Sequence, residues 1–278
     1  MLKCLLILSC LYLSGCLSPT PIPTPLQRTV HAEKLAKGAG WKEHTIPTAL
    51  FTLKAYGSPA RGKTKRLTIY IEGDGLSWLS EDRPSHNPTP LVPTGLKLAI
   101  QDQKNKPIVY LARPCQFVFQ ESWRTCRQDY WTHLRFSPDV IHAMNQAVDY
   151  LKHYYHAQKI TLIGYSGGGT IATLLSAGRQ DVIQLITVAA ILDIDHWVRQ
   201  ENLTPLYGSL NPADEWNNLV SIPQTHWVGG QDRVVSKDVA LAFSERFPAQ
   251  KKPQIHVIED FNHTCCWARD WMSLLSSS

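Results

Sequence analysis

A short segment around Ser166 has the residue types of a nucleophile held on a tight turn. Residues 164–168 read Gly-Tyr-Ser-Gly-Gly, so glycine stands two residues before and two residues after the serine. An apolar, β-branched run typical of a strand precedes the segment, and a helical pattern follows it over 170–177. On a sharp strand-to-helix turn only glycine avoids a clash at both flanking positions, and the serine hydroxyl projects from the strand end. The pattern therefore predicts Ser166 as a nucleophile; glycines that serve packing alone are the alternative.

Two later segments carry the acid and the base that such a serine needs. Asp232 follows a strand-like run over 224–229, and His263 follows another over 254–258. An imidazole can accept the serine proton and later return it to a leaving group, while a carboxylate fixes the tautomer of the ring. Asp232 and His263 are therefore candidates for these two roles.

Other residues compete for these two roles. Asp193 is the main alternative acid because it also follows a strand-like run, over 183–189, and Asp195 is a weaker one. Among the eleven histidines, His226 and His256 lie inside predicted strands, where a structural role is expected. Asp193 and Asp195 therefore stand as alternatives to Asp232 for the acid.

Strand and helix patterns alternate from residue 67 to the end of the chain. Helices long enough to cross back over a sheet favour a largely parallel α/β architecture. The predicted strands are 49–56, 67–72, 107–112, 159–164, 183–189, 224–229 and 254–258, and the predicted helices are 137–155, 170–177, 237–246 and 266–275.

With the serine turn, the acid and the histidine in this chain order, residues 67–275 resemble the α/β-hydrolase family. The resemblance extends to short phrases, such as His-Thr-Cys-Cys-Trp at 263–267, that are similar to those of small bacterial members of the family. It implies that Asp232 is the acid and His263 the base of a catalytic triad with Ser166. It also implies a mostly parallel sheet of six or seven strands with helices on both faces. The insertion over 190–222 is where a modest cap would lie.

The resemblance also implies an oxyanion hole. It would be built from the amide of Gly167 and an amide in the loop after strand 67–72, with Asp74 the first choice and Gly75 the second. This chain departs from many relatives because Glu72 and Asp74 bring two carboxylates close to that loop. We expect these side chains to turn away or to be paired with cations.

No cofactor or metal is predicted. The Gly-x-Gly at 73–75 follows a strand, but Trp78 occupies the third small position of a dinucleotide fingerprint. The chain contains no phosphate-binding G-x-x-x-x-G-K-[ST] motif and no Cys-x-x-Cys pair of the kind that binds zinc.

The first fifteen residues have the pattern of a signal peptide. Lys3 precedes an apolar run over 4–14 that is too short to span a bilayer as a permanent helix. The run ends in Leu-Ser-Gly-Cys, which resembles the lipobox of bacterial lipoproteins and implies that Cys16 carries the lipid as the mature N-terminus. The resemblance predicts a lipid-anchored protein of the bacterial envelope that faces the periplasm. Leu17 favours the outer membrane, and an ordinary cleaved signal is the alternative.

A proline-rich tether is expected between the lipid and the folded body. Proline occupies every second position from 19 to 25, which favours extended chain. Ten such residues span roughly 30 Å at about 3.1 Å each. We therefore predict a signal over 1–15, a lipidated tether over 16–40 and one hydrolase domain over 41–278.

Composition agrees with one globular domain that does not bind nucleic acid. The chain has 278 residues, 44% of them hydrophobic and 18% charged, with a net charge of +5. Its densest basic stretch, at 61–66, is interpreted as a solvated turn.

Cysteine usage fits an exported protein. Three of the seven cysteines lie within residues 1–16, and an even number remains for disulfides in an oxidising compartment. Three pairings are possible, and the sequence does not choose among them. The remaining four are Cys115, Cys126, Cys265 and Cys266.

Together these patterns predict a membrane-anchored serine hydrolase that cleaves a carboxylic ester, or a related acyl bond of a small molecule, through an acyl-enzyme. An amidase, thioesterase or peptidase with the same triad is one alternative. A non-catalytic lipoprotein that uses the fold to bind a cell-wall or lipid partner is another. The oligomeric state is left open.

Overall fold

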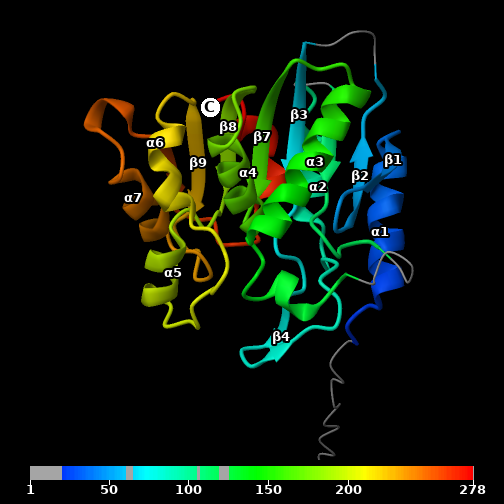
Figure 1. Ribbon diagram of the computed structural model, residues 1–278, viewed down its shortest axis with the longest axis horizontal. Coiled ribbons are helices and arrows are strands. Elements are labelled where there is room, and N and C mark those ends of the chain that lie inside the picture. Colours follow the sequence, from blue (N-terminus) through cyan, green and yellow to red (C-terminus); the bar gives the residue numbers. More distant parts are fainter. Residues whose placement is uncertain (1–20, 61–64, 105–106, 119–124, 278) are drawn as a thin grey trace, which may run out of the picture.

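An eight-stranded sheet forms the centre of the computed structural model, which describes residues 21–60, 65–104, 107–118 and 125–277 (Figure 1). The strand order is β1-β2-β6-β3-β7-β8-β9-β10. β1 pairs antiparallel with β2 and β2 with β6, and all other neighbours in this sheet are parallel. The strands are β1 (Lys42–Pro47), β2 (Thr52–Gly57), β3 (Arg66–Ile71), β6 (Ile108–Leu111), β7 (Lys159–Tyr165), β8 (Val182–Val188), β9 (Gln224–Gly229) and β10 (Gln254–Ile258).

The predicted fold class is confirmed, but the sheet has eight strands instead of six or seven. The single strand expected over 49–56 is the second half of a hairpin, in which the Thr48 hydroxyl donates to the Phe51 carbonyl at the turn. The missed strand, β1, is at the edge of the sheet and buries only His44 and Ile46. Such an edge strand needs little apolar sequence, so its pattern is weak.

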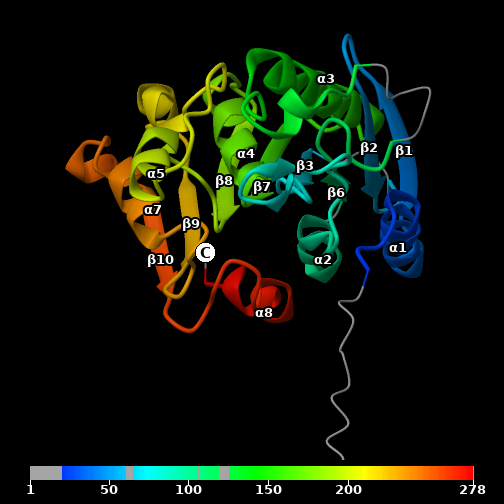
Figure 2. The ribbon, with the colours of Figure 1, turned by 90° about the horizontal axis from the view of Figure 1, so that it is seen from below.

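Helices cover both faces of the sheet (Figure 2). On one face α3 (Pro138–Tyr154) and α4 (Gly167–Ala177) enclose the largest apolar cluster, and α1 (Pro25–Gly38), α2 (Thr94–Gln101) and α8 (Trp267–Leu274) pack on the other. Beyond β8 the chain forms α5 (Ile194–Gln200), α6 (Trp216–Leu219) and α7 (Lys237–Ser244). The helices predicted over 137–155, 170–177, 237–246 and 266–275 are confirmed as α3, α4, α7 and α8.

Helix α3 shows how local sequence sets these boundaries. The Ser137 hydroxyl accepts a hydrogen bond from the Val140 amide, and Pro138 stands at the first helical position, where no amide donor is needed. Met144 and Leu151 are fully buried on its inner face. The helix therefore begins at its cap and lies against the sheet by its apolar stripe.

Part of the expected tether over 16–40 is folded, which corrects that prediction. Thr24 and Gln27 form a reciprocal capping box, and Pro25 starts helix α1, in which Ala32 and Ala36 are buried. The alternating prolines end at Pro25, and the helix begins as soon as they no longer interrupt it. The folded body therefore begins near residue 25 and not at 41. The expected signal over 1–15, the lipidation site Cys16 and residues 17–20 lie outside the described residues.

The four remaining cysteines pair with their neighbours in sequence. Cys115 bonds to Cys126, with their Cα atoms 5.6 Å apart, and Cys265 bonds to Cys266. Lys65, from the basic stretch, is exposed at the start of β3 as a solvated turn requires, whereas 61–64 lie outside the described residues. Within the described ranges, the helices are all too short or too polar to span a bilayer.

The carboxyl ends of the parallel strands lie at one edge of the sheet. In Figure 1 the arrowheads of β3 and β9 point to the lower end of the view, where the small hairpin β4 (Trp78–Ser80) and β5 (Arg83–Pro84) and helix α5 also lie. The loops that follow β3, β7, β9 and β10 all leave from this edge, so it gathers the residues singled out by sequence.

Candidate active site

Ser166 stands on the tight turn that its flanking glycines predict. Its backbone has φ 51° and ψ −127°, a left-handed φ that is unusual for a residue other than glycine. A Cβ at Gly164 would collide with the backbone of Gly168, and one at Gly168 would collide with the Ile71 carbonyl. The Ser166 amide donates to the Val188 carbonyl of β8 at 2.8 Å. The turn is therefore fixed between β7 and α4.

The structure brings Ser166, His263 and Asp232 together. His263 Nε2 lies 3.0 Å from Ser166 Oγ, and His263 Nδ1 lies 2.8 Å from Asp232 Oδ2. The second carboxylate oxygen of Asp232 accepts hydrogen bonds from the amides of Val234 and Val235 at 2.8 and 2.9 Å. All of the Asp232 side chain is buried, so its charge is oriented by two amides and faces the imidazole.

The competing acids and histidines lie elsewhere. Asp193 caps α5 by accepting from the His196 amide, and its other oxygen lies 3.5 Å from Arg246. Asp195 accepts a long hydrogen bond, 3.5 Å, from the Asn211 side chain. These two carboxylates therefore form hydrogen bonds and an ion pair around the insertion after β8, and neither is bonded to the His263 imidazole.

The two strand histidines are structural, as their positions predict. His226 is fully buried and its Nδ1 lies 2.8 Å from the Thr187 hydroxyl, while burial lowers its pKa to about 3. His256 stacks on Trp227 with the ring centroids 4.4 Å apart. Neither ring is bonded to Ser166.

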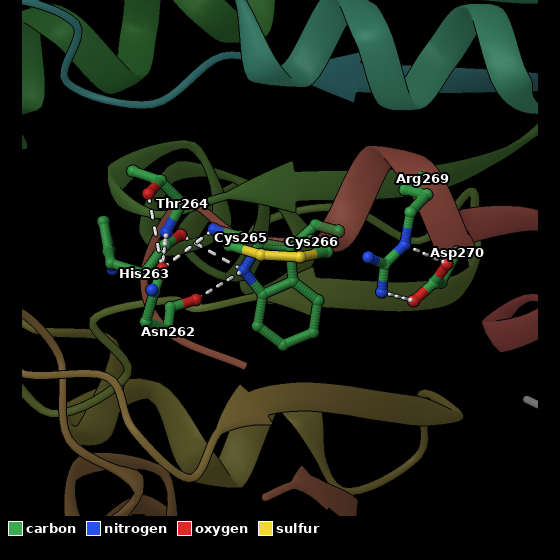
Figure 3. Close-up of a disulfide and its surroundings, with 8 residues drawn as sticks. Asn262, His263, Thr264, Cys265, Cys266, Arg269 and Asp270 are labelled. Atoms are coloured by element: carbon green, nitrogen blue, oxygen red, sulfur yellow. Dashed lines mark hydrogen bonds and ion pairs between the residues drawn. A yellow bond between two sulfur atoms is a disulfide. The ribbon is translucent and has the colours of Figure 1, made fainter. Parts of the chain in front are cut away.

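Hydrogen bonds between side chains and the loop backbone hold the loop that carries His263 (Figure 3). The Asn262 side chain accepts hydrogen bonds from the amides of Thr264 and Cys265 at 3.0 and 2.9 Å. The His263 carbonyl accepts from the indole N–H of Trp267 at 3.1 Å and from the Tyr165 hydroxyl at 2.9 Å. A donor from β7 and a donor from α8 thus fix the backbone beneath the imidazole. Sequence reasoning assigned no role to Tyr165 or Trp267.

On the other side of Ser166 lies the loop that follows β3. A Cβ on Gly73 would lie 3.3 Å from Ser166 Cβ, and one on Gly167 would collide with the Asp74 carboxylate. Neither the Gly167 amide nor the Asp74 amide donates a hydrogen bond to any described residue. Both expected donors therefore belong to segments next to Ser166 and make no hydrogen bond within the described residues. Gly75, the second choice, has φ 67° and packs against the Pro88 carbonyl.

The Asp74 carboxylate is paired with two arginines. One oxygen contacts Arg113 Nη1, and the other lies 2.7 Å from Arg135 Nη1. Burial raises the pKa of this carboxyl, but the two guanidinium groups together outweigh burial and hold the pKa below its usual range. The expectation that this carboxylate must be paired is confirmed.

Glu72 is turned toward helix α2. Its Oε1 accepts hydrogen bonds from the Gly73 amide at 2.9 Å and from the Gly95 amide, near the start of α2, at 3.0 Å. Burial raises the pKa of Glu72, and its bonds to backbone amides oppose the shift only in part. The expectation that this carboxylate points away is confirmed as well.

Sequence reasoning missed the residues that hold the oxyanion loop. Arg113 and Arg135 are linked, because Arg113 Nη2 donates to the Arg135 carbonyl at 2.6 Å. Gln116 donates to the Gly73 carbonyl at 2.9 Å and accepts from the Arg113 amide. Arg113 directly follows the strand predicted over 107–112, and that position at the carboxyl edge was an available signal. No comparable pattern marks Arg135.

The insertion over 190–222 lies beside the Asp232 loop. Trp197 on α5 is buried, and its indole N–H donates to the Val234 carbonyl at 2.7 Å. Trp216 packs against Phe247, whereas Tyr207 is 73% exposed. Some of the aromatic residues are therefore core and others are surface. In the described part of the chain, no group of three or more His, Cys, Asp or Glu side chains is placed to hold a metal ion.

Solved structures of α/β serine hydrolases share this architecture. An esterase of Pyrococcus furiosus is 15% identical, with a TM-score of 0.59 over 87% of this chain and 93% of that chain. Est1E of Butyrivibrio proteoclasticus is 16% identical, with a TM-score of 0.57 over 84% and 96%. A membrane phospholipase A, described as a bacterial virulence factor, is 15% identical, with a TM-score of 0.54 over 91% and 92%.

No protein-family model and no curated protein matches the sequence. At 15 to 16% identity these likenesses show the fold, and the chain has the α/β-hydrolase fold along most of its length.

Proposed function

We propose that this α/β-hydrolase-fold protein is a serine hydrolase that cleaves a carboxylic ester through an acyl-enzyme. The observation that carries the proposal is His263, whose two ring nitrogens lie 3.0 Å from Ser166 Oγ and 2.8 Å from Asp232 Oδ2. A serine hydroxyl is a weak nucleophile alone, and this arrangement supplies the base and the group that orients the base.

The reaction would proceed in two halves. Ser166 Oγ attacks the acyl carbon while His263 Nε2 takes its proton, and the resulting oxyanion accepts hydrogen bonds from the Gly167 and Asp74 amides. As the tetrahedral intermediate collapses, His263 returns the proton to the departing alkoxide. Water, activated by the same imidazole, then releases the acid and restores the serine.

Charges around the oxyanion loop favour this chemistry. Arg113, Arg135 and Asp74 form a buried group of two cations and one anion, so its net charge is 2 − 1 = +1. The Asp74 carboxylate lies close to Gly167 without presenting an uncompensated negative charge to the intermediate. The acidic residue Asp74 in this loop is therefore compatible with stabilisation of an oxyanion.

An ester is the substrate class that we favour. Among the similar solved structures one is described as an esterase and another as a phospholipase A, both of which act on esters. Amides and thioesters are the alternatives, because the three side chains alone do not select the leaving group. A panel of matched ester, thioester and anilide substrates separates these options through their kcat/KM values.

We further propose that the protein is a lipoprotein of the bacterial envelope, anchored through Cys16 and facing the periplasm. The proposal is supported by the Leu-Ser-Gly-Cys sequence at 13–16 after a short apolar run. Mass spectrometry of the N-terminal peptide from membranes tests it, and an unmodified Cys16 thiol would refute it.

Replacement of the nucleophile tests the hydrolase proposal. Ser166→Ala should reduce turnover of p-nitrophenyl acetate to the background rate and abolish labelling by a fluorophosphonate probe. Ser176→Ala is the matched control. Ser176 lies in α4, the helix that follows Ser166, and its hydroxyl donates to the Ala172 carbonyl, so this variant should keep both ester turnover and probe labelling. A folded wild-type protein that neither turns over esters nor reacts with the probe would favour the non-catalytic binding role.

A further inference from the structure

Exposed apolar side chains collect around the carboxyl edge of the sheet, where Ser166 lies. They come from the β4 region, the segment before α2, the insertion after α5 and the loop after Asp232. We call them the apolar rim: Trp78, Leu91, Val92, Leu203, Tyr207, Leu210 and Val234, which are 39 to 73% exposed. Charged residues such as Arg83, Arg199 and Arg233 are exposed among them.

Backbone contacts tie the apolar rim to the site. The Val234 amide donates to Asp232, and the Leu210 amide donates to the carbonyl of Phe136, the ring that lies under the Arg113 guanidinium. Members of the rim are therefore rigidly connected to the triad on one side and to the oxyanion loop on the other. An exposed apolar border of this kind around a site marks an interaction surface.

The N-terminal end of helix α1 lies at the same edge. Arg28, in the first turn of α1, donates to the Thr89 carbonyl, and the preceding Pro88 carbonyl packs against Gly75. In Figure 1 the dark blue start of α1 lies at the lower end of the view, together with β4 and α5. Ile22 and Leu26 at this end are 55 and 60% exposed. The chain thus enters the folded body beside the oxyanion loop.

We propose that the apolar rim rests on a lipid bilayer with Ser166 directed at the membrane, so that the substrate is the acyl ester of a membrane lipid. This inference rests on the proposed hydrolase function. Ile22 is the sixth residue after Cys16, and six extended residue steps reach about 20 Å. A lipid on Cys16 would therefore hold the start of α1, and the edge beside it, close to the bilayer. Apolar side chains on that edge lose water contact there.

A pair of matched double variants tests the orientation in the full chain. Tyr207→Ser with Leu210→Ser removes two rim side chains, and Tyr154→Ser with Leu241→Ser removes a tyrosine and a leucine that are 41 and 44% exposed outside the rim. With phosphatidylcholine vesicles, we expect the rim variant to hydrolyse lipid about tenfold more slowly, since two partly inserted side chains are lost. Both variants should keep p-nitrophenyl acetate turnover within about twofold of wild type.

The outcomes separate this inference from the proposed function. Equal vesicle rates for the two variants, or no vesicle hydrolysis by a wild type that turns over the soluble ester, would overturn the membrane orientation alone. Loss of soluble ester turnover in the wild type would overturn the hydrolase proposal instead. A rim variant whose main change is a smaller oligomer in solution would identify the rim as a contact between copies.

A binding measurement with the Ser166→Ala chain is independent of turnover. Vesicles of brominated phosphatidylcholine should quench a tryptophan signal that Trp78→Phe removes, because Trp78 lies in the rim. Quenching that is unchanged by Trp78→Phe would contradict insertion of this edge.

Discussion

Two aspartates, Asp232 and the partly buried Asp74, lie on opposite sides of Ser166 and are paired in different ways. Asp232 faces the imidazole of His263 and accepts two backbone amides, whereas Asp74 is clamped between Arg113 and Arg135. An imidazole gains and loses a proton near neutral pH, but a guanidinium remains charged.

The difference assigns each side of the serine its own electrostatic task. On the Asp232 side, the proposed reaction forms a positive charge on the imidazole ring next to the carboxylate during proton transfer. On the Asp74 side, two guanidinium groups and one carboxylate give a net charge of +1 before substrate arrives, so the neighbouring amides face no net negative charge. A substitution at Asp232 should therefore change the rate above all, and one at Asp74 should change stability above all.

The largest expected effect is that of Asp232→Asn on turnover. An amide side chain would donate to the imidazole and favour the wrong tautomer, so kcat/KM for p-nitrophenyl acetate at pH 7.5 should fall by about a thousandfold to ten-thousandfold. Asp193→Asn is the matched control, because Asp193 is a buried carboxylate at the same edge that caps α5. Its effect should be less than about tenfold. A larger loss in the control than in Asp232→Asn would transfer the acid role to Asp193.

Asp74→Asn should act mainly on stability. It leaves two buried guanidinium groups with one neutral partner, which should lower the free energy of unfolding by about 3 kcal/mol in urea titrations. Asp270→Asn removes one partner of the surface pair with Arg269 and should leave the free energy of unfolding essentially unchanged. Equal effects of the two substitutions would mean that the Asp74 cluster contributes nothing beyond a surface pair.

The pH dependence of this loss follows from the lowered pKa of Asp74. A carboxyl whose folded pKa lies below its unfolded value stabilises the fold above the unfolded pKa, and this contribution disappears as pH falls through the folded pKa. The stability difference between wild type and Asp74→Asn should thus be full at pH 7 and shrink in acid.

The same contrast separates what the sequence predicts from what it does not. Ser166 was predictable because its turn requires glycines at fixed spacing. Asp232 and His263 were predictable because the resemblance to α/β-hydrolases places the acid and the histidine in loops after later strands. The pairing requirement for Asp74 was also predictable, since a buried carboxylate beside an oxyanion must be balanced. The partners were not, because Arg135 precedes α3 in an irregular segment without periodicity.

The N-terminal region was the least predictable part of the fold. Alternating prolines indicated extended chain, and the helix that begins at Pro25 has only small apolar residues, Ala32 and Ala36, to bury. Strand β1 likewise buries two side chains. The conformation of elements with so little apolar surface depends on their packing against the rest of the fold, and a local sequence pattern does not contain that information.

A smaller effect on turnover is expected at the support of the histidine loop. Tyr165→Phe removes the hydroxyl that donates to the His263 carbonyl, while the Trp267 indole still donates to the same oxygen. The loss of one of two neutral hydrogen bonds should lower kcat by about threefold to tenfold, with little change in KM. Tyr154→Phe on α3 is the control and should leave kcat unchanged. A stability loss without a kcat change would make Tyr165 a packing residue only.

The smallest effect, and the one that tests the oxyanion side most finely, is that of Glu72→Gln. The amide oxygen of glutamine can still accept from Gly73 and Gly95, so turnover should stay close to wild type. Because burial raises the folded pKa of Glu72, the native state binds its proton more tightly than the unfolded chain, and wild-type stability falls as pH rises from the unfolded pKa through the folded one. Glutamine removes this loss, so the variant should gain stability relative to wild type as pH rises above the unfolded pKa in urea titrations. A stability difference that does not change with pH would show that the pKa of Glu72 is the same in the folded and unfolded states, and one that changes in the opposite direction would show that its amides hold it ionised, as the arginines hold Asp74.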